Sequence, residues 1–308
     1  MRAFIFPGQG SQSAGMGAAL AGASRAAQDV FDEVDEALGQ NLFRLMRDGP
    51  DDQLKLTENA QPAIMAHSIA VLRAWSVDLP DVAGFVAGHS LGEYSALCAA
   101  GSFDLPTTAK LLKLRGQAMQ QAVPVGQGAM AALLGADLAL AQKVAEAAAQ
   151  GEVCTVANDN DPSQVVISGA KAAIDRAIAL AKEMGAKRAV PLPVSAPFHC
   201  PLMQPAAEAM QDALSYVVLE QPVVPVFANV TAQPQSDPDT IRNQLVEQVT
   251  GMVRWRESVA NMFDAGVHEF VEVGGKVLGP MVKRIVPDAT VVSVVTIEDI
   301  ETASKEIA

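Results

Sequence analysis

A short apolar run that leads straight into a glycine-flanked serine is the feature that most limits how this chain can fold. Residues 82–87 are predicted to form a buried strand, Gly88-His89-Ser90-Leu91-Gly92 follows at once, and residues 93–100 have a helical pattern. A G-x-S-x-G turn between a strand and a helix is typical of a nucleophile elbow, which exposes the serine hydroxyl at a helix N-terminus. The pattern predicts an α/β fold with Ser90 as the nucleophile. The alternative is a serine that only caps the helix.

Strands and helices alternate along most of the remaining sequence, which favours helices packed on a sheet. A strand is predicted at residues 3–6, and helices are predicted at residues 24–38, 58–75 and 106–122. Towards the C-terminus, the predicted helices are residues 201–214, 239–248 and 256–265, and the predicted strands are residues 223–228, 267–273 and 290–294.

The middle of the chain has a different order of elements. Strands are predicted at residues 129–134, 153–157, 164–168 and 187–192, helices at 138–150 and 171–184, and a turn-rich segment at 158–163. This βαββαβ order is that of a ferredoxin-like unit. We therefore predict a large α/β-hydrolase-like domain, residues 1–125 and 194–308, interrupted by a small ferredoxin-like domain, residues 126–193. A cleft between the two is the expected ligand site.

Composition argues against several classes of function. The 308 residues carry a net charge of −13, whereas a nucleic-acid-binding surface is strongly basic. No stretch is long and apolar enough for a membrane span, and the N-terminus has no signal-peptide pattern. The three cysteines are scattered without metal-ligand spacing, which favours a reduced, cytoplasmic location and predicts no bound metal.

A serine nucleophile needs a base, and the chain has four histidines. His89 is adjacent to Ser90, and neighbouring side chains on a tight turn diverge. His67 lies in an apolar helical stretch and His268 at the edge of a predicted strand, where packing roles are expected. His199 follows a proline-punctuated segment that leaves the small domain, and loops at domain junctions often hold catalytic groups. We predict His199 as the base, with a structural role in the turn as the alternative.

An arginine lies on the apolar side of the predicted helix at residues 106–122. At about 100° per residue, Arg115 falls among Leu111, Leu112, Ala118 and Met119. One interpretation is an internal ion pair with a carboxylate of the chain. The other is that the planar guanidinium binds a carboxylate of the substrate in bidentate fashion. The helix pattern alone leaves both open.

Two glycine-rich segments do not match nucleotide-binding motifs. Gly8-Gln9-Gly10-Ser11-Gln12 follows the first strand but lacks G-x-G-x-x-G spacing, and the segment at residues 274–279 lacks the lysine and hydroxyl residue of a Walker loop. Both are better explained as tight turns that bring backbone close to another group. For residues 8–12, that group could be an oxyanion next to Ser90.

With these residues in place, the chain resembles the bacterial malonyl-CoA:acyl carrier protein transacylases, the acyltransferase family of type II fatty acid synthesis, over nearly its whole length. The matching segments are Phe6-Pro7-Gly8-Gln9-Gly10-Ser11-Gln12, Gly88-His89-Ser90-Leu91-Gly92-Glu93-Tyr94, Arg115-Gly116 with Met119-Gln120, Gln164-Val165-Val166-Ile167-Ser168-Gly169, Pro191-Leu192-Pro193-Val194-Ser195 leading to His199, and Glu272-Val273-Gly274 with Lys276-Val277-Leu278. The family also has an inserted ferredoxin-like domain.

The resemblance implies a ping-pong reaction. Ser90 would attack the thioester of malonyl-CoA with His199 as base, and the malonyl-serine ester would then pass its acyl group to the phosphopantetheine thiol of acyl carrier protein. The backbone N–H groups of Gln9 and Leu91 would form the oxyanion hole, and Arg115 would bind the malonyl carboxylate. No cofactor is expected.

The resemblance also assigns supporting residues. The family has no aspartate to complete a triad; a backbone carbonyl orients the histidine, and Gln248 occupies the matching position. Asn160, in the predicted loop before Gln164, matches a position near the histidine. Phe198 resembles the malonyl-selecting version of its motif in related acyltransferase domains, whereas many bacterial members have serine there. Malonyl remains the expected acyl group.

Partner binding is expected to need local positive charge, because carrier proteins are acidic and so is this chain. Lys182, Lys187 and Arg188 cluster on the small domain, and Lys283 with Arg284 on the large one; each could equally be a solvated surface charge. The expected partners are acyl carrier protein and malonyl-CoA, without nucleic acid or membrane, and the expected state is a monomer.

Two rival functions remain at this point. A serine hydrolase or thioesterase shares the elbow, but that class places an acid between serine and histidine and has no reason to keep a cation in the acyl pocket. A silent protein that only binds carrier protein or CoA is the second rival. The presence of Ser90, Arg115 and His199 together disfavours it.

Overall fold

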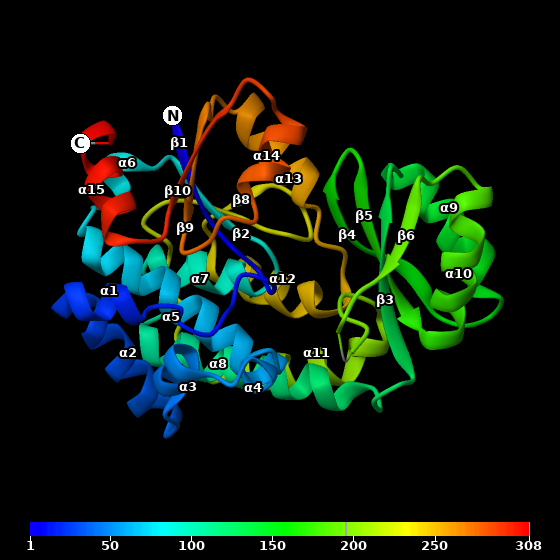
Figure 1. The fold of residues 1–308 in the computed structure, drawn as a ribbon, viewed down its shortest axis with the longest axis horizontal. Helices are drawn as coiled ribbons and strands as arrows, with labels where there is room; N and C mark the ends of the chain where they lie inside the picture. Colours follow the sequence, from blue (N-terminus) through cyan, green and yellow to red (C-terminus); the bar gives the residue numbers. More distant parts are fainter. Residues whose placement is uncertain (195, 308) are drawn as a thin grey trace.

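Two separate β-sheets, each with its own helices, make up the molecule in a computed structural model that describes residues 1–194 and 196–307 (Figure 1). Ser195, which ends one of the motifs named above, lies outside the described residues. The smaller sheet, with α9 and α10, lies at one end of the molecule, and both chain termini lie beside the larger sheet (Figure 1). The described fold is therefore mixed α/β, as predicted.

The larger sheet has six strands in the order β10-β9-β1-β2-β7-β8. All neighbouring pairs are parallel except β7 and β8. Parallel strands covered on both faces are expected to be apolar throughout, and β1 fits this rule because Ala3, Phe4, Ile5 and Phe6 are fully buried. The strand bounds are β1 (Arg2–Phe6), β2 (Phe85–Gly88), β7 (Val226–Phe227), β8 (Pro234–Gln235), β9 (Glu269–Val273) and β10 (Thr290–Val294).

Helices of very different length cover this sheet. The longest, α5, is buried along most of its length and packs against α2 and α8. The helices are α1 (Ala18–Ala23), α2 (Arg25–Leu38), α3 (Leu42–Asp48), α4 (Asp51–Leu54), α5 (Thr57–Trp75), α6 (Leu79–Val82), α7 (Leu91–Ala99), α8 (Leu105–Ala122), the 3₁₀ turn η1 (Pro201–Met203), α11 (Gln204–Ser215), α12 (Pro238–Thr250), α13 (Trp255–Asp264), α14 (Gly279–Ile285) and α15 (Ile297–Glu306). No helix in the described ranges is long and apolar enough to cross a membrane.

The smaller sheet is antiparallel, with strand order β4-β5-β3-β6. Its elements are β3 (Gly128–Leu134), α9 (Leu138–Ala149), β4 (Cys154–Asp161), β5 (Gln164–Ala170), α10 (Lys171–Glu183) and β6 (Arg188–Pro191), in the predicted βαββαβ order. It has its own apolar core, built mainly from small side chains such as those of Ala131, Val144 and Ala177.

Strand β4 joins the smaller sheet to the larger unit. The buried carboxylate of Asp159 accepts two hydrogen bonds from Nε of Arg256, and the buried carboxylate of Asp161 accepts one from Nε of Arg284 at 2.7 Å. The backbone N–H of Asp159 also donates to the carbonyl of Val253 at 3.0 Å. Buried charges are stable only when paired and hydrogen-bonded, so these contacts fix how the two units meet.

The structure differs from the predicted segments in several places. The strand predicted at residues 82–87 is shorter, because the helix α6 ends at Val82 and β2 begins only at Phe85. The segment 158–163, predicted as turn-rich, is strand as far as Asp161, with two register shifts in its pairing. Its polar residues suggested a loop, yet they are buried and contact the larger unit. Short helices such as α3 and α14 offered too few turns for a periodic pattern.

Candidate active site

The serine turn has the strained geometry expected of a nucleophile elbow. Ser90 lies between β2 and α7 with φ 54° and ψ −112°, a region that non-glycine residues rarely occupy. A Cβ added at Gly88 would overlap the backbone of Gly92, and one added at Gly92 would overlap the carbonyl of Phe6. Both flanking glycines are therefore required by close backbone contact, and the turn brings α7 against β1.

A buried asparagine holds the turn from the adjacent strand. Asn229, just beyond β7, accepts a hydrogen bond from the backbone N–H of Ser90 at 2.8 Å and donates one to the carbonyl of Gly88 at 2.7 Å. These two bonds satisfy the N–H of Ser90 and the carbonyl of Gly88, which precede the serine Cα in the turn and would otherwise be buried without partners. The side chain therefore stabilises the strained conformation of the serine.

The imidazole of His199 contacts the serine hydroxyl directly. Nε2 of His199 is 2.7 Å from Oγ of Ser90, and Nδ1 is 2.8 Å from the backbone carbonyl of Gln248. A carbonyl can only accept a hydrogen bond, so Nδ1 carries the proton and Nε2 of the neutral ring presents a lone pair to the hydroxyl. This is the tautomer that a general base for Ser90 requires.

The surroundings keep this imidazole neutral. Burial, together with the positive charge of Arg115, lowers the pKa of His199 to about 3. The side chain is only 4% exposed. A neutral ring can accept the serine proton, whereas a protonated one could not.

Arg115 is almost fully buried at 1% exposure, on α8 beside the serine. Its Nη1 donates to Oε1 of Gln61 at 2.8 Å, and its Nη2 donates to Oε1 of Gln248 at 2.8 Å and to Oγ of Ser90 at 3.2 Å. Burial lowers its pKa from the ordinary value. Within residues 1–194 and 196–307 no carboxylate forms an ion pair with it, so the internal ion pair considered above is absent there. A buried cation held only by neutral groups is suited to an incoming anion.

A cavity of about 480 Å³ opens onto these groups. Gln9 and Leu91 line it together with Ser90, Arg115 and His199. Leu91 is the first residue of α7, where backbone N–H groups have no acceptor inside the helix and can bind a developing negative charge. Phe198 and residues 192–194, on the segment leaving the smaller unit, form the opposite wall.

The hydrogen bond of Asn160 goes to His89. Its Oδ1 is 2.8 Å from Nε2 of His89, and it belongs to strand β4 rather than to a loop. Asn158, two residues earlier, lines the cavity instead. Asn160 therefore bonds the histidine that precedes the nucleophile. His89 also lines the cavity, and within the described residues its ring bonds Asn160 rather than the serine.

Three buried polar residues of the site were missed by sequence reasoning: Gln61, Glu93 and Asn229. Gln61 and Asn229 bond Arg115 and Ser90 as described, and Glu93 accepts hydrogen bonds from the backbone of Asn229 and the side chain of Gln248. A signal existed for one of them. Asn229 follows the carboxyl end of a predicted strand, where ligand-binding residues of α/β folds gather.

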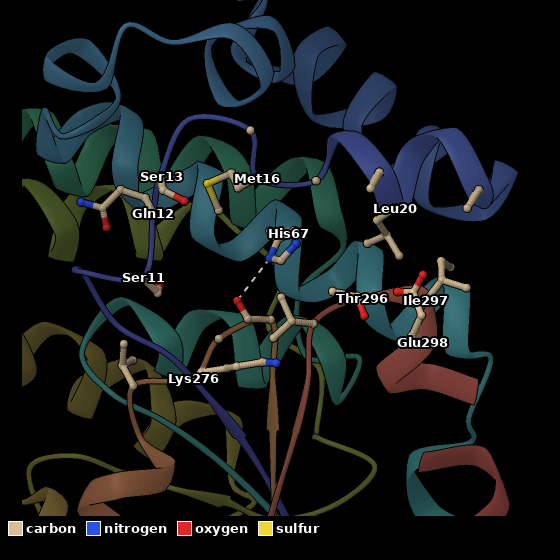
Figure 2. A pocket seen from close by; sticks show the side chains of 18 of the residues that line it. Ser11, Gln12, Ser13, Met16, Leu20, His67, Lys276, Thr296, Ile297 and Glu298 are labelled. Carbon is tan, nitrogen blue, oxygen red and sulfur yellow. Dashed lines mark hydrogen bonds between the residues drawn. The ribbon is translucent and has the colours of Figure 1, made fainter. Parts of the chain in front are cut away.

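A larger cavity, of about 660 Å³, is lined in part by the loop at residues 10–17 (Figure 2). It shares Gly10 and Gln12 with the serine cavity but contains neither the nucleophile nor the base. His67 lines it, and Nδ1 of this histidine bonds the carbonyl of Gly274 at 3.2 Å (Figure 2). His268 packs its ring against Phe263. Both histidines therefore have the packing roles that were predicted.

The second glycine-rich segment is a tight turn around a buried carboxylate. Glu272 at the end of β9 accepts hydrogen bonds from the backbone N–H groups of Val277, Leu278 and Gly279 at 2.8–2.9 Å. A Cβ added at Gly275 would contact Pro7. The turn therefore packs against Pro7, at the start of the first glycine-rich segment. Its N–H groups bind the carboxylate of Glu272 rather than a phosphate.

The two predicted basic clusters meet in one groove. Lys187, Arg188 and Arg284 line a depression of about 570 Å³ that also contains Asp161 and is separate from the serine cavity. Lys283 instead donates to the carbonyls of Pro287 and Ala289. Because one of the cations is paired with Asp161, the free positive charge in the groove comes mainly from Lys187 and Arg188, both exposed.

Comparison with known proteins agrees with this site. The acyl transferase domain family matches residues 3–290, which defines the class of protein. The chain is 47% identical over 294 residues to the malonyl CoA-acyl carrier protein transacylase of Haemophilus influenzae, covering 95% of this chain and 94% of that protein. It is 45% identical to the protein of the same name in Bacillus subtilis, covering 98% and 95%. The chain belongs to the malonyl-CoA:acyl carrier protein transacylase family, and the resemblance inferred from the motifs is confirmed.

Solved structures show the same fold. The acyl-carrier-protein-S-malonyltransferase of Bartonella henselae has a TM-score of 0.97 and 50% identity, with 99% of each chain covered. A malonyl-transacylase solved in complex with a type II PKS acyl-carrier protein has a TM-score of 0.96 and 40% identity, again with 99% of each chain covered. Identity at this level supports similarity of the site as well as of the fold.

Proposed function

We propose that this protein transfers the malonyl group from malonyl-CoA to the phosphopantetheine thiol of acyl carrier protein, through a malonyl ester on Ser90, and thereby supplies fatty acid biosynthesis. One observation supports this most directly. The serine hydroxyl lies 2.7 Å from a neutral imidazole and 3.2 Å from a buried guanidinium that forms no ion pair within the described residues. The family membership, and the structure of a relative in complex with an acyl-carrier protein, also support this function.

In the first half-reaction, Oγ of Ser90 attacks the thioester carbonyl while its proton moves to Nε2 of His199. The carbonyl oxygen becomes an oxyanion, stabilised by the backbone N–H groups of Gln9 and Leu91. The tetrahedral intermediate then breaks its C–S bond, and the leaving CoA thiol takes the proton from His199. The products are malonyl-Ser90 and free CoA, with every proton accounted for.

In the second half-reaction, the carrier protein's thiol gives its proton to His199 and its sulfur attacks the ester carbonyl. The C–O bond to Ser90 breaks, and the serine oxygen recovers the proton from the imidazole. The carbonyl of Gln248 holds the ring in the required tautomer throughout. This chemistry uses only side chains and backbone of the chain, so we propose no cofactor and no metal.

The acyl group is selected by Arg115 in this proposal. Its planar fork would exchange its bond to Oγ of Ser90 for two bonds to the malonyl carboxylate, a pairing that suits guanidinium geometry. Phe198, 9% exposed in the cavity wall, limits the space beside the malonyl methylene. Malonyl rather than a branched acyl group is therefore the proposed substrate.

Mass spectrometry after brief exposure to malonyl-CoA tests the proposal. A covalent malonyl adduct on the peptide containing Ser90 is expected, and Ser90→Ala should abolish it. Absence of an adduct on the unaltered protein would contradict the proposal and favour a silent binding protein. Release of free malonate as fast as transfer to carrier protein would favour a hydrolase.

We also propose how the chain divides into domains. The antiparallel sheet with α9 and α10 is proposed to be a ferredoxin-like domain, residues 126–193, inserted into an α/β-hydrolase-like domain, residues 1–125 and 194–308. The observed strand order and the βαββαβ sequence of elements support this division. A cytoplasmic monomer that binds neither nucleic acid nor membrane remains the expectation from the sequence.

Carrier-protein docking is proposed at the basic groove between the two sheets. Lys187→Glu with Arg188→Glu should weaken transfer to carrier protein, which is acidic, more than acylation by malonyl-CoA. Lys143→Glu with Lys182→Glu is the matched control, since this pair makes the same charge change at exposed sites outside the groove. An equal effect of the double variant on both half-reactions would contradict docking at this groove.

A further inference from the structure

A buried carboxylate of the site takes no part in the proposed chemistry. Glu93 lies in the first turn of α7, three residues after the nucleophile, and is 1% exposed. It touches neither the serine oxygen nor the imidazole. A buried carboxylate is costly unless hydrogen bonds or a nearby cation stabilise its charged form, so its presence beside the nucleophile calls for an explanation.

Both hydrogen bonds of Glu93 go to residues that hold the catalytic groups. Its Oε2 accepts one from the backbone N–H of Asn229 at 3.1 Å and one from Nε2 of Gln248 at 2.7 Å. Asn229 bonds the N–H of Ser90 and the carbonyl of Gly88. Gln248 bonds Arg115 through its side chain and His199 through its carbonyl. Glu93 is therefore linked to Ser90, Arg115 and His199 through one intervening residue in each case.

The side-chain amide of Gln248 has two possible orientations, and its neighbours select one. Its oxygen must face Arg115, which can only donate, and its nitrogen must face Glu93, which in the ionised form can only accept. The same nitrogen is 3.1 Å from the carbonyl of Ser90. If the amide were flipped, its NH₂ would oppose the guanidinium, and Nη2 of Arg115 would lose the nearer of its two acceptors and keep only Oγ of Ser90.

We propose that Glu93 is a positioning residue for malonyl recognition: its carboxylate fixes the amide of Gln248 so that Arg115 stays aligned to bind the malonyl carboxylate. This inference rests on the proposed function and adds a residue that controls the specificity of the same site. The charged form needs neighbours that favour it. Burial raises the pKa of Glu93, while the hydrogen bonds from Gln248 and Asn229 and the positive charge of Arg115 lower it, so that the pKa lies at about 7.

The test is Glu93→Gln, which keeps the shape of the side chain and removes its charge. A neutral amide can donate as well as accept, so Gln248 is no longer restricted to one orientation. We expect kcat/KM for malonyl-CoA to fall about tenfold or more relative to kcat/KM for acetyl-CoA, through a higher KM for malonyl-CoA; tenfold corresponds to about 1.4 kcal/mol. Acetyl has no carboxylate to align, so its transfer should change little.

A competing effect acts in the opposite direction. Removing the negative charge of Glu93 lowers repulsion of the malonyl carboxylate, which by itself would raise the malonyl-to-acetyl ratio. The sign of the change therefore decides between positioning and simple charge. A fall supports the proposal, and a rise or an unchanged ratio overturns it.

The matched control is Glu272→Gln, because Glu272 is equally buried and accepts backbone hydrogen bonds outside the site. It should lower the melting temperature without changing the malonyl-to-acetyl ratio; a ratio that falls as far as in Glu93→Gln would overturn the proposal. If Glu93→Gln does not fold, Glu93→Asp replaces it. Its shorter carboxylate cannot reach both donors, so a smaller fall in the ratio is expected and no fall overturns the inference.

Different results would contradict the proposed function and the proposed role of Glu93. If the unaltered protein forms no malonyl adduct, the proposed function is wrong. If it forms the adduct and transfers malonyl, but Glu93→Gln lowers malonyl and acetyl transfer by the same factor, only the role of Glu93 is wrong and the residue is structural.

Discussion

The two members of the catalytic pair are held in different ways. Ser90 is fixed by its own turn, where Gly88 and Gly92 allow backbone contacts that no side chain would permit. His199 comes from a segment 109 residues further along the chain and is held by single hydrogen bonds to the serine and to a carbonyl of α12. The nucleophile therefore depends on the fold itself, whereas the base depends on how distant segments meet.

This difference separates stability from activity. Changes at the elbow should act mainly on folding, because they force backbone atoms apart. Changes to His199 and Arg115 should act mainly on the reaction, because both side chains line the cavity and contact the hydroxyl of Ser90. Measuring both quantities for each variant tests the distinction.

The largest effect is expected for His199→Ala. Loss of the base should lower the rate of malonyl-serine formation by about 10²–10⁴-fold, the usual contribution of a positioned general base. The melting temperature should change little. Rapid-quench mass spectrometry measures the first quantity and calorimetry the second. A fall in rate of less than tenfold would show that His199 is not the base.

Arg115→Ala should have the next largest effect, and a selective one. The malonyl carboxylate would enter a buried site without its cation. The activation free energy derived from kcat/KM for malonyl-CoA should therefore rise by about 3–5 kcal/mol. Transfer of acetyl should be spared or improved. Arg115→Lys is the control, because it keeps the charge without the planar fork and should recover only part of the malonyl activity. An equal fall for both acyl groups would mark Arg115 as structural.

Gly92→Ala tests the serine side of the comparison. A methyl group at this position meets the backbone carbonyls of Phe6 and Pro7, so the strand and helix must separate. A loss of about 1–3 kcal/mol in the free energy of unfolding is expected, measured by urea denaturation. Gly22→Ala in α1 is the matched control, since no atom lies within 4 Å of the added group. Equal stability of the two variants would refute the close-contact argument.

The smallest effect concerns the charge state of the base. With a pKa of about 3, the His199 ring should show no titration between pH 5 and pH 8 in NMR of ¹³C-labelled histidine, whereas the unfolded chain titrates near about 6.5. Because the folded pKa is the lower one, this group contributes stability above the unfolded pKa and loses it as pH falls towards 3. Arg115→Ala removes a repelling charge and should raise the pKa of His199.

The sequence allowed Ser90 and its turn to be predicted almost completely, but the surroundings of His199 and Arg115 only in outline. Strand, glycine pattern and helix occur together within about a dozen residues, so local rules suffice for Ser90. Arg115 was noticed because a charge on an apolar helix face is unusual, but its environment was left open. Gln61, Asn229 and Glu93 could not be assigned, because uncharged amides and a carboxylate in a helical first turn have many ordinary roles. Their functions depend on contacts between segments that no local pattern records.

The junction between the sheets shows the same limit. Asp159 and Asp161 lie in a polar stretch that predicted a turn, yet both are buried because Arg256 and Arg284 pair with them from distant helices. Only the tertiary contact explains why the strand continues. These pairs join β4 to α13 and α14, and no local pattern in the sequence predicts them.

The partner that orients the imidazole is a main-chain oxygen, which every amino acid possesses. In a serine–histidine–aspartate arrangement, one codon change can delete the orienting group; here, no substitution at position 248 can remove it. The side chain of Gln248 is therefore free to be altered for acyl-group preference while the base keeps its proton on Nδ1. Substitutions at residue 248 and its neighbours can therefore change the acyl specificity during evolution, while every intermediate sequence keeps the carbonyl that orients the base.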